Sequence, residues 1–106
     1  MVIQWPVIIE FAQGHDYAWA AGFDEVTEHR LEAGDRLLDS HGHAHVLSHA
    51  NGAGLYWQHS EGVVSVPQLN IKLQRYAASL GVCCTSKLQV RTPADAIALV
   101  AWLEQH

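Results

Sequence analysis

The sequence predicts a single α+β domain over residues 1–106. An antiparallel β meander with hairpins comes first, and two C-terminal helices, with one additional strand between them, pack on one face of the sheet. In the first half of the chain, short runs of Val, Ile and aromatic residues alternate with Gly, Asn and Asp turns, as is typical of strands. In the second half, two segments begin with helix-capping residues and continue with apolar residues at helical spacing. A chain that is 49% hydrophobic can bury one core.

The first hairpin is predicted from strands at residues 2–11 and 17–21, with turn residues at 14–16 between them. Pro6 lacks a backbone N–H, so we expect the first strand to lie at a sheet edge or to carry a bulge near Pro6. The following polar segment, residues 23–33, is compatible with either a short helix or an irregular crossing.

A second hairpin is predicted from strands at residues 35–39 and 43–48, joined by the loop Ser40-His41-Gly42. Glycine at the third loop position suits a type I turn that is closed by a residue with positive φ. Turn residues at 51–54 then lead to a predicted strand at 55–59.

The first C-terminal helix begins with a capping-box pattern, in which Ser65 is the N-cap and Gln68 reaches back from the third helical position. Gly81 supplies the left-handed residue that ends the helix. The predicted apolar stripe of this helix consists of Leu69, Leu73, Tyr76, Ala77 and Leu80.

The second helix is predicted over residues 94–104. Thr92 is its N-cap, Pro93 occupies the first helical position, and Asp95 lies near the positive helix end. Residues 82–90, between the two helices, predict the additional strand.

Four histidines fall within the nine positions from His41 to His49. In the predicted hairpin Asp39 lies opposite His43, and His43 and His45 share a face because strand side chains alternate. Two imidazoles and a carboxylate in this arrangement can bind Zn²⁺ or Ni²⁺, so His43, His45 and Asp39 are the candidate metal ligands. We favour a hairpin whose histidines hold no ion, because the H-x-H spacing arises easily in a chain with eight histidines.

A pH-responsive role is a third interpretation of the histidines. Protonation of all eight would add eight charges and move the formal net charge from −5 to +3. We rank this interpretation below the metal site.

Composition argues against several classes of function. The six Lys and Arg residues form no block in a chain of net charge −5, so neither nucleic acid nor an anionic membrane surface is expected as a partner. Motifs such as G-x-S-x-G and H-E-x-x-H are absent from the sequence, and we therefore do not expect an enzyme. Cys83 and Cys84 are adjacent, which disfavours a structural disulfide between them and predicts a cytoplasmic protein.

The C-terminal helix is apolar at every position from 96 to 103, whereas a helix packed by one face normally shows a polar stripe on the other. Ile97, Val100 and Ala101 are assigned to the core, with Leu99 and Leu103 beside them. The opposite side is assigned to a partner surface, in the simplest case of a homodimer, and consists of Ala94, Ala98 and Trp102. The alternative is that the first C-terminal helix or the N-terminal strand covers that side.

Three stretches resemble a small uncharacterised gammaproteobacterial family, a domain of unknown function of about this length. They are Trp5-Pro6, the run D-R-L-L-D-S-H-G from residue 35, and C-C-T-S-K-L from residue 83. The resemblance implies a bacterial, cytoplasmic α+β domain. Because the family has no assigned activity, it transfers no functional residue to this chain. It also implies polar or aromatic strand residues where H-A-H stands here, which counts against a metal site.

The sequence therefore predicts a non-catalytic interaction or accessory module that acts on an unknown protein partner or on a second copy. The alternative is a divalent transition-metal-binding protein that uses the histidine-rich hairpin, and a small enzyme ranks third.

Overall fold

The computed structural model describes residues 3–13, 16–50, 54–82 and 88–105. It contains one five-stranded antiparallel sheet in the order β2-β1-β3-β4-β5. The strands are β1 (Val7–Glu10), β2 (Tyr17–Ala20), β3 (Arg36–Asp39), β4 (His43–Ala50) and β5 (Gly54–Val63). The helices are α1 (Phe23–Val26), α2 (Val66–Ser79) and α3 (Pro93–Glu104). The predicted α+β class, with the sheet first and two long helices last, is confirmed.

β1 lies inside the sheet, between β2 and β3. Ile8 is opposite Trp19 in β2 and opposite Leu38 in β3. The chain therefore does not follow a simple meander, because it passes from β2 through α1 to β3 on the other side of β1. The prediction of an edge strand or a bulge near Pro6 was wrong, because the strand begins one residue after Pro6 and needs no N–H from it.

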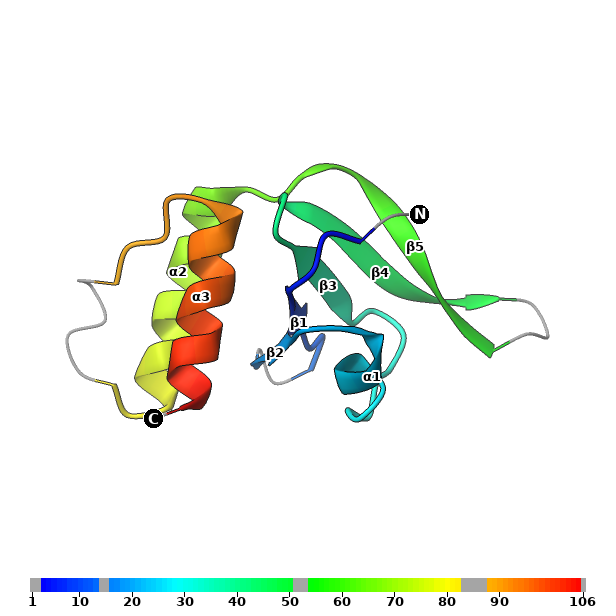
Figure 1. Cartoon of the computed structure of the whole chain (residues 1–106), viewed down its shortest axis with the longest axis horizontal. Helices are drawn as coiled ribbons and strands as arrows, with labels where there is room; N and C mark the ends of the chain where they lie inside the picture. The colour runs from blue at the N-terminus through cyan, green and yellow to red at the C-terminus, as the bar shows by residue number, and fades with distance from the viewer. Residues whose placement is uncertain (1–2, 14–15, 51–53, 83–87, 106) are drawn as a thin grey trace.

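Side chains on the two faces of the sheet enter two separate cores, because successive strand residues point to opposite faces. On one face, Ile8 and Leu38 point toward the two long helices and form a core with Leu73 of α2 and Val100 of α3. The other face packs against α1 and the segment before β1, through Val7, Ile9, Ala18, Leu37, Val26 and Ile3. Figure 1 shows α2 and α3 side by side on one side of the sheet and α1 on the other. The long helices thus cover one face as predicted, and the second layer was not anticipated.

The start of α2 differs from the prediction, whereas the start of α3 agrees with it. Ser65 occupies the N-cap position of α2, but its side chain makes no capping hydrogen bond. Thr92 Oγ1 accepts a hydrogen bond of 3.1 Å from the backbone N–H of Asp95, so α3 has the predicted cap. Gly81 follows α2 with a φ of 86°, as predicted. Leu80, assigned to the buried stripe of this helix, is instead 51% exposed.

The additional strand between the helices is absent at both described ends of its segment. Val82 and residues 88–90 belong to no strand, and residues 83–87, which include both cysteines, lie outside the described residues. The backbone here is bound by side chains of α2. Asn70 Oδ1 accepts from the N–H of Val90 at 2.9 Å, and Gln74 Nε2 donates to the carbonyl of Leu88 at 2.9 Å. These bonds replace the ladder bonds that a strand would need.

The outer edge of β2 is closed by the two long helices. The Tyr76 hydroxyl of α2 donates to the carbonyl of Tyr17 at 3.0 Å, and Glu104 of α3 accepts from the N–H of Trp19 at 2.9 Å. These side chains occupy backbone groups that would otherwise be free to pair with another strand.

Candidate functional site

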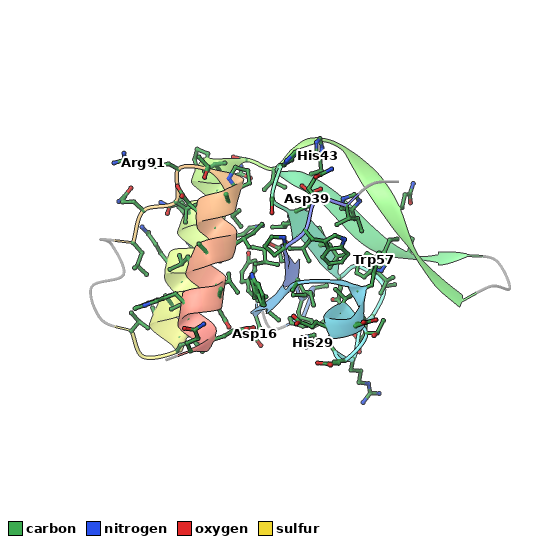
Figure 2. The ribbon with its side chains drawn as sticks, viewed as in Figure 1. Asp16, His29, Asp39, His43, Trp57 and Arg91 are labelled. Carbon is green, nitrogen blue, oxygen red and sulfur yellow. The ribbon has the colours of Figure 1, made fainter. Side chains whose placement is uncertain are left out.

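The predicted histidine hairpin is present between β3 and β4. Leu37 is opposite His45, and Gly42 has a φ of 85°. The N–H of Gly42 donates to the carbonyl of Asp39 at 3.0 Å, which closes the turn. Figure 2 shows Asp39 and His43 together at one end of the sheet.

The Asp39 carboxylate is occupied mainly by backbone groups of the turn. Its Oδ1 accepts from the N–H of His41 at 3.0 Å and from the N–H of His43 at 2.9 Å. Its Oδ2 accepts from the N–H of Gln4 at 3.3 Å and lies 3.4 Å from Nε2 of His45. Burial alone would raise the pKa of this carboxyl, but the hydrogen bonds outweigh burial and lower it. Asp39 therefore works as a turn cap.

The three candidate metal ligands do not converge as an ion would require. The imidazole of His45 is fully buried against Asp39, whereas His43 reaches Asp39 through its backbone N–H. Within the described ranges, no group of three or more His, Cys, Asp or Glu side chains is placed to hold a metal ion. The geometry supports a structural role for this hairpin.

A second buried aspartate performs the matching role at the other end of β3. Asp35 Oδ1 accepts from the N–H of Ala12 at 2.8 Å, and Oδ2 accepts from the N–H of Glu32 at 2.9 Å. Asp35 thus binds the chain just after β1, and Asp39 binds it at Gln4, just before β1. The two aspartates of the run D-R-L-L-D therefore bind the backbone on both sides of β1.

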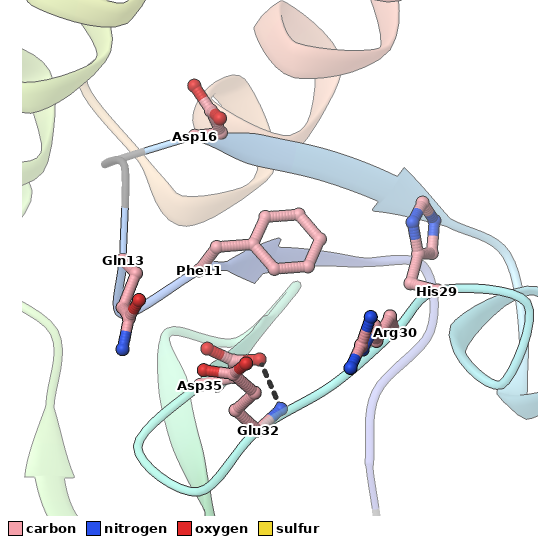
Figure 3. Close-up of a pocket in the computed structure, with 7 residues that line it drawn as sticks. All are labelled: Phe11, Gln13, Asp16, His29, Arg30, Glu32 and Asp35. Carbon is pink, nitrogen blue, oxygen red and sulfur yellow. Dashed lines mark hydrogen bonds between the residues drawn. The ribbon is translucent and has the colours of Figure 1, made fainter.

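Two cavities lie at the opposite end of the sheet, where β1 ends and β2 begins. Figure 2 places Asp16 and His29 at this end, away from Asp39 and His43. The first, here called the α1-side cavity, has a volume of about 390 Å³. Figure 3 shows the Phe11 ring in the middle of its lining, with His29 and Arg30 at one end and Gln13 at the other. The rings of Phe11 and His29 are 5.7 Å apart.

The second cavity, here called the helix-side cavity, lies against α2 and has a volume of about 460 Å³. Its lining includes Glu10, Phe11, Tyr17, Lys72, Arg75 and Tyr76. The Tyr17 hydroxyl donates to Glu10 Oε2 at 2.5 Å. Burial, followed by this bond to Glu10, raises the pKa of Tyr17, so its hydroxyl stays protonated. Tyr17 consequently acts as a hydrogen-bond donor and contributes its ring to the cavity wall, and it does not serve as a proton acceptor.

Sequence reasoning missed both cavities because their residues come from distant parts of the chain. One signal was available for the helix-side cavity. Lys72, Arg75, Tyr76 and Ser79 are spaced as one stripe of a helix, and two of them belong to the six basic residues of the chain.

The three side chains assigned to a partner surface lie on an exposed side of α3. Ala94 and Ala98 are exposed, and Trp102 is 44% exposed. Ala96, Ile97, Val100 and Leu103 are buried, and Leu99 and Ala101 are partly buried.

Residues 5–100 match the model of the DUF4144 family, which is described as a protein structure with unknown function. The chain belongs to this family. The DUF4144 chain is also similar to the NMR structure of a protein from Shewanella amazonensis, with 26% identity and a TM-score of 0.69. That similarity covers 95% of this chain and 90% of the Shewanella chain. These findings confirm the resemblance to an uncharacterised gammaproteobacterial family and the α+β fold.

No curated protein matches the DUF4144 chain. In its described part, no helix is both long and apolar enough to cross a membrane. The family description names no activity, so a function has to be argued from the surfaces of the chain.

Proposed function

We propose that this DUF4144 protein is a non-catalytic interaction module of the cytoplasm. Its binding surface is the outer face of α3, formed by Ala94, Ala98 and Trp102, and its simplest partner is a second copy of the chain.

The exposure of Trp102 carries this proposal. It is the largest side chain on a helix with an apolar residue at every position from 96 to 103, and 44% of it faces solvent. Burying the exposed part of such a side chain stabilises an assembly by about 25 cal/mol for each Å² of apolar surface removed from water. Ala94 and Ala98 precede Trp102 by two turns and one turn of helix, so a partner could approach the backbone closely beside the aromatic anchor.

The helix layer supports the same assignment. Four large hydrophobic side chains are exposed in the described residues: Ile71 lies on α2, Leu80 directly follows α2, Trp102 lies on α3, and Phe23 lies on α1. Figure 1 shows α2 and α3 side by side, and three of these four exposed side chains belong to these two helices or directly follow one of them. Concentrated apolar exposure of this kind marks interaction surfaces.

The buried carboxylates of Asp35 and Asp39 have structural roles, which supports a binding function over a catalytic one. Asp35 and Asp39 are 3% and 1% exposed, and their oxygens accept backbone hydrogen bonds that hold loops. Groups committed in this way are not poised for proton transfer to a substrate.

Sedimentation equilibrium of the wild type, Trp102→Glu and Ala98→Glu tests the proposal. We expect the wild type to dimerise at micromolar concentration, and both variants to be monomers because each buries a charge in the interface. Ala98→Glu keeps the test valid if Trp102→Glu fails to fold, since Ala98 is exposed.

Phe23→Glu is the matched control, because it places the same charge on an aromatic residue that is 46% exposed and lies on α1. It should dimerise like the wild type. A monomeric wild type, or a Phe23→Glu variant that dissociates as readily as Ala98→Glu, would contradict self-association through α3.

A further inference from the structure

Positive charge is scarce in this chain and gathers beside the helix-side cavity. Three of its six basic residues, Arg36, Lys72 and Arg75, line this cavity or pair with its Glu10. Arg36 Nε lies 3.1 Å from Glu10 Oε1, so Arg36 already balances the carboxylate of Glu10. Lys72 and Arg75 therefore make the α2 wall of the cavity positively charged.

Both of these cations are available to a ligand. The Lys72 ammonium is 3.8 Å from Glu10 Oε2 and its side chain is 52% exposed, which makes this ion pair weak. Arg75 is also exposed, and no carboxylate in the described part of the chain forms an ion pair with it. The two residues lie one turn apart on α2, so both can reach one bound group.

Three aromatic rings supply most of the apolar wall, and the third hydroxyl of the lining, that of Ser79, is already used because it donates to the carbonyl of Tyr76 at 2.6 Å. The rings of Tyr17 and Tyr76 meet edge to face at 5.5 Å. Their hydroxyls are already used, since Tyr17 donates to Glu10 and Tyr76 donates to the carbonyl of Tyr17. Phe11 adds a third ring. A ligand that fills this space needs an apolar body.

Positive and negative charges lie on different sides of the cavity. Burial, followed by the carboxylates of Glu104 and Asp16, raises the pKa of Tyr76. The Tyr76 hydroxyl therefore lies in negative surroundings, and the anionic group of a ligand belongs beside Arg75 on α2.

From this arrangement we infer that the helix-side cavity is a binding site for a small amphipathic carboxylic acid. The carboxylate would bind the guanidinium of Arg75, assisted by Lys72, while an aryl or alkyl body packs against Phe11, Tyr17 and Tyr76. The volume of about 460 Å³ is within the range of small-molecule sites. This site is independent of the α3 face and requires no self-association.

The test uses three probes of one shape, phenylbutanoate, phenylbutanamide and phenylbutylamine, titrated into the ¹⁵N-labelled protein. We expect the acid to shift the backbone amide signals of Phe11, Tyr17 and Tyr76 and to bind at least about tenfold more tightly than the neutral amide. The amine should bind most weakly, because Lys72 and Arg75 repel a cation at the wall where the carboxylate binds.

Arg75→Gln should weaken binding of the acid about tenfold and leave the affinity of the neutral amide unchanged. Arg91→Gln is the matched control, because Arg91 is also exposed and lies near the start of α3, away from the cavity (Figure 2). This control should bind the acid like the wild type. The proposal is overturned if the acid causes no shifts at the cavity up to millimolar concentration, if acid and amide bind equally, or if Arg91→Gln weakens binding as much as Arg75→Gln.

Discussion

The imidazole of His45 and the carboxylate of Asp39 form a buried pair, with 3.4 Å between Nε2 and Oδ2. The side chains are 0% and 1% exposed. Asp39 also accepts a hydrogen bond from the N–H of Gln4, so the pair joins the histidine hairpin to the segment that precedes β1. His45 of the hairpin is thus a core residue.

His45→Ala should lower the free energy of unfolding by about 2–4 kcal/mol, because it leaves a cavity and removes a partner from a buried carboxylate. Urea unfolding followed by tryptophan fluorescence measures this change. His41→Ala is the control, since His41 is exposed and its substitution should cost less than about 0.5 kcal/mol. Equal unfolding midpoints for the two variants would show that the buried pair contributes nothing.

Asp39 should make the protein sensitive to acid. The pKa of Asp39 is lower in the folded chain than its ordinary value of about 3.9, so the folded state binds fewer protons at this site than the unfolded state. The resulting stabilisation is complete above the ordinary pKa and is lost as the pH falls through the folded pKa. Unfolding measured from neutral pH to about pH 2 should show this loss.

Asp39→Asn should be less stable near neutral pH by about 2–3 kcal/mol and should lose part of this acid dependence. One end of the new amide is an NH₂ group, which would face a backbone donor instead of accepting from it. Asp24→Asn, at an exposed position, is expected to keep the wild-type profile. If the slopes of Asp39→Asn and wild type coincide below about pH 4, Asp39 is not the group responsible.

Gly42→Ala should destabilise the protein by about 1–2 kcal/mol, because a φ of 85° is costly for a residue with a Cβ. Thermal unfolding measures this effect. Gly22→Ala is the matched control, because Gly22 has an extended φ of −166° and an added Cβ would meet nothing within 4 Å. The turn would be misassigned if both substitutions changed the melting temperature equally.

Excess Zn²⁺ or Ni²⁺ should leave the melting temperature unchanged, because Asp39 is committed to backbone donors and His45 is buried. A ligand that binds only the folded state would raise it. A rise that disappears in His43→Ala would establish the metal-binding alternative. His45 is unsuitable for this comparison, because its replacement is expected to damage the fold itself.

Features that depend on neighbouring residues could be predicted from the sequence. The turn at Gly42 and the cap of α3 at Thr92 involve residues within a few positions of each other. The capping box at Ser65 shows the limit of this reasoning, because the pattern is present and the side-chain bond is not.

Features built from distant residues could not be predicted in the same way. β1 becomes an internal strand because it pairs with both β2 and β3, and periodicity does not reveal pairing partners. The helix-side cavity joins Glu10 to Lys72, and the hydrogen bond between Gln4 and Asp39 likewise joins residues 35 positions apart in the sequence. The histidine spacing placed Asp39 and His45 close together correctly, but the backbone bonds that occupy Asp39 are visible only in three dimensions.

The central claim, that the outer face of α3 is the interaction surface, is tested most directly by a dilution series in ¹H–¹⁵N correlation spectra of the wild type. On dilution from millimolar to micromolar concentration, we expect the amide signals of Ala94, Ala98 and Trp102 to shift together along one binding curve, while those of Asp39 and His45 stay fixed. Spectra that do not change with concentration, or shifts confined to the outer edge of β5, would contradict the claim.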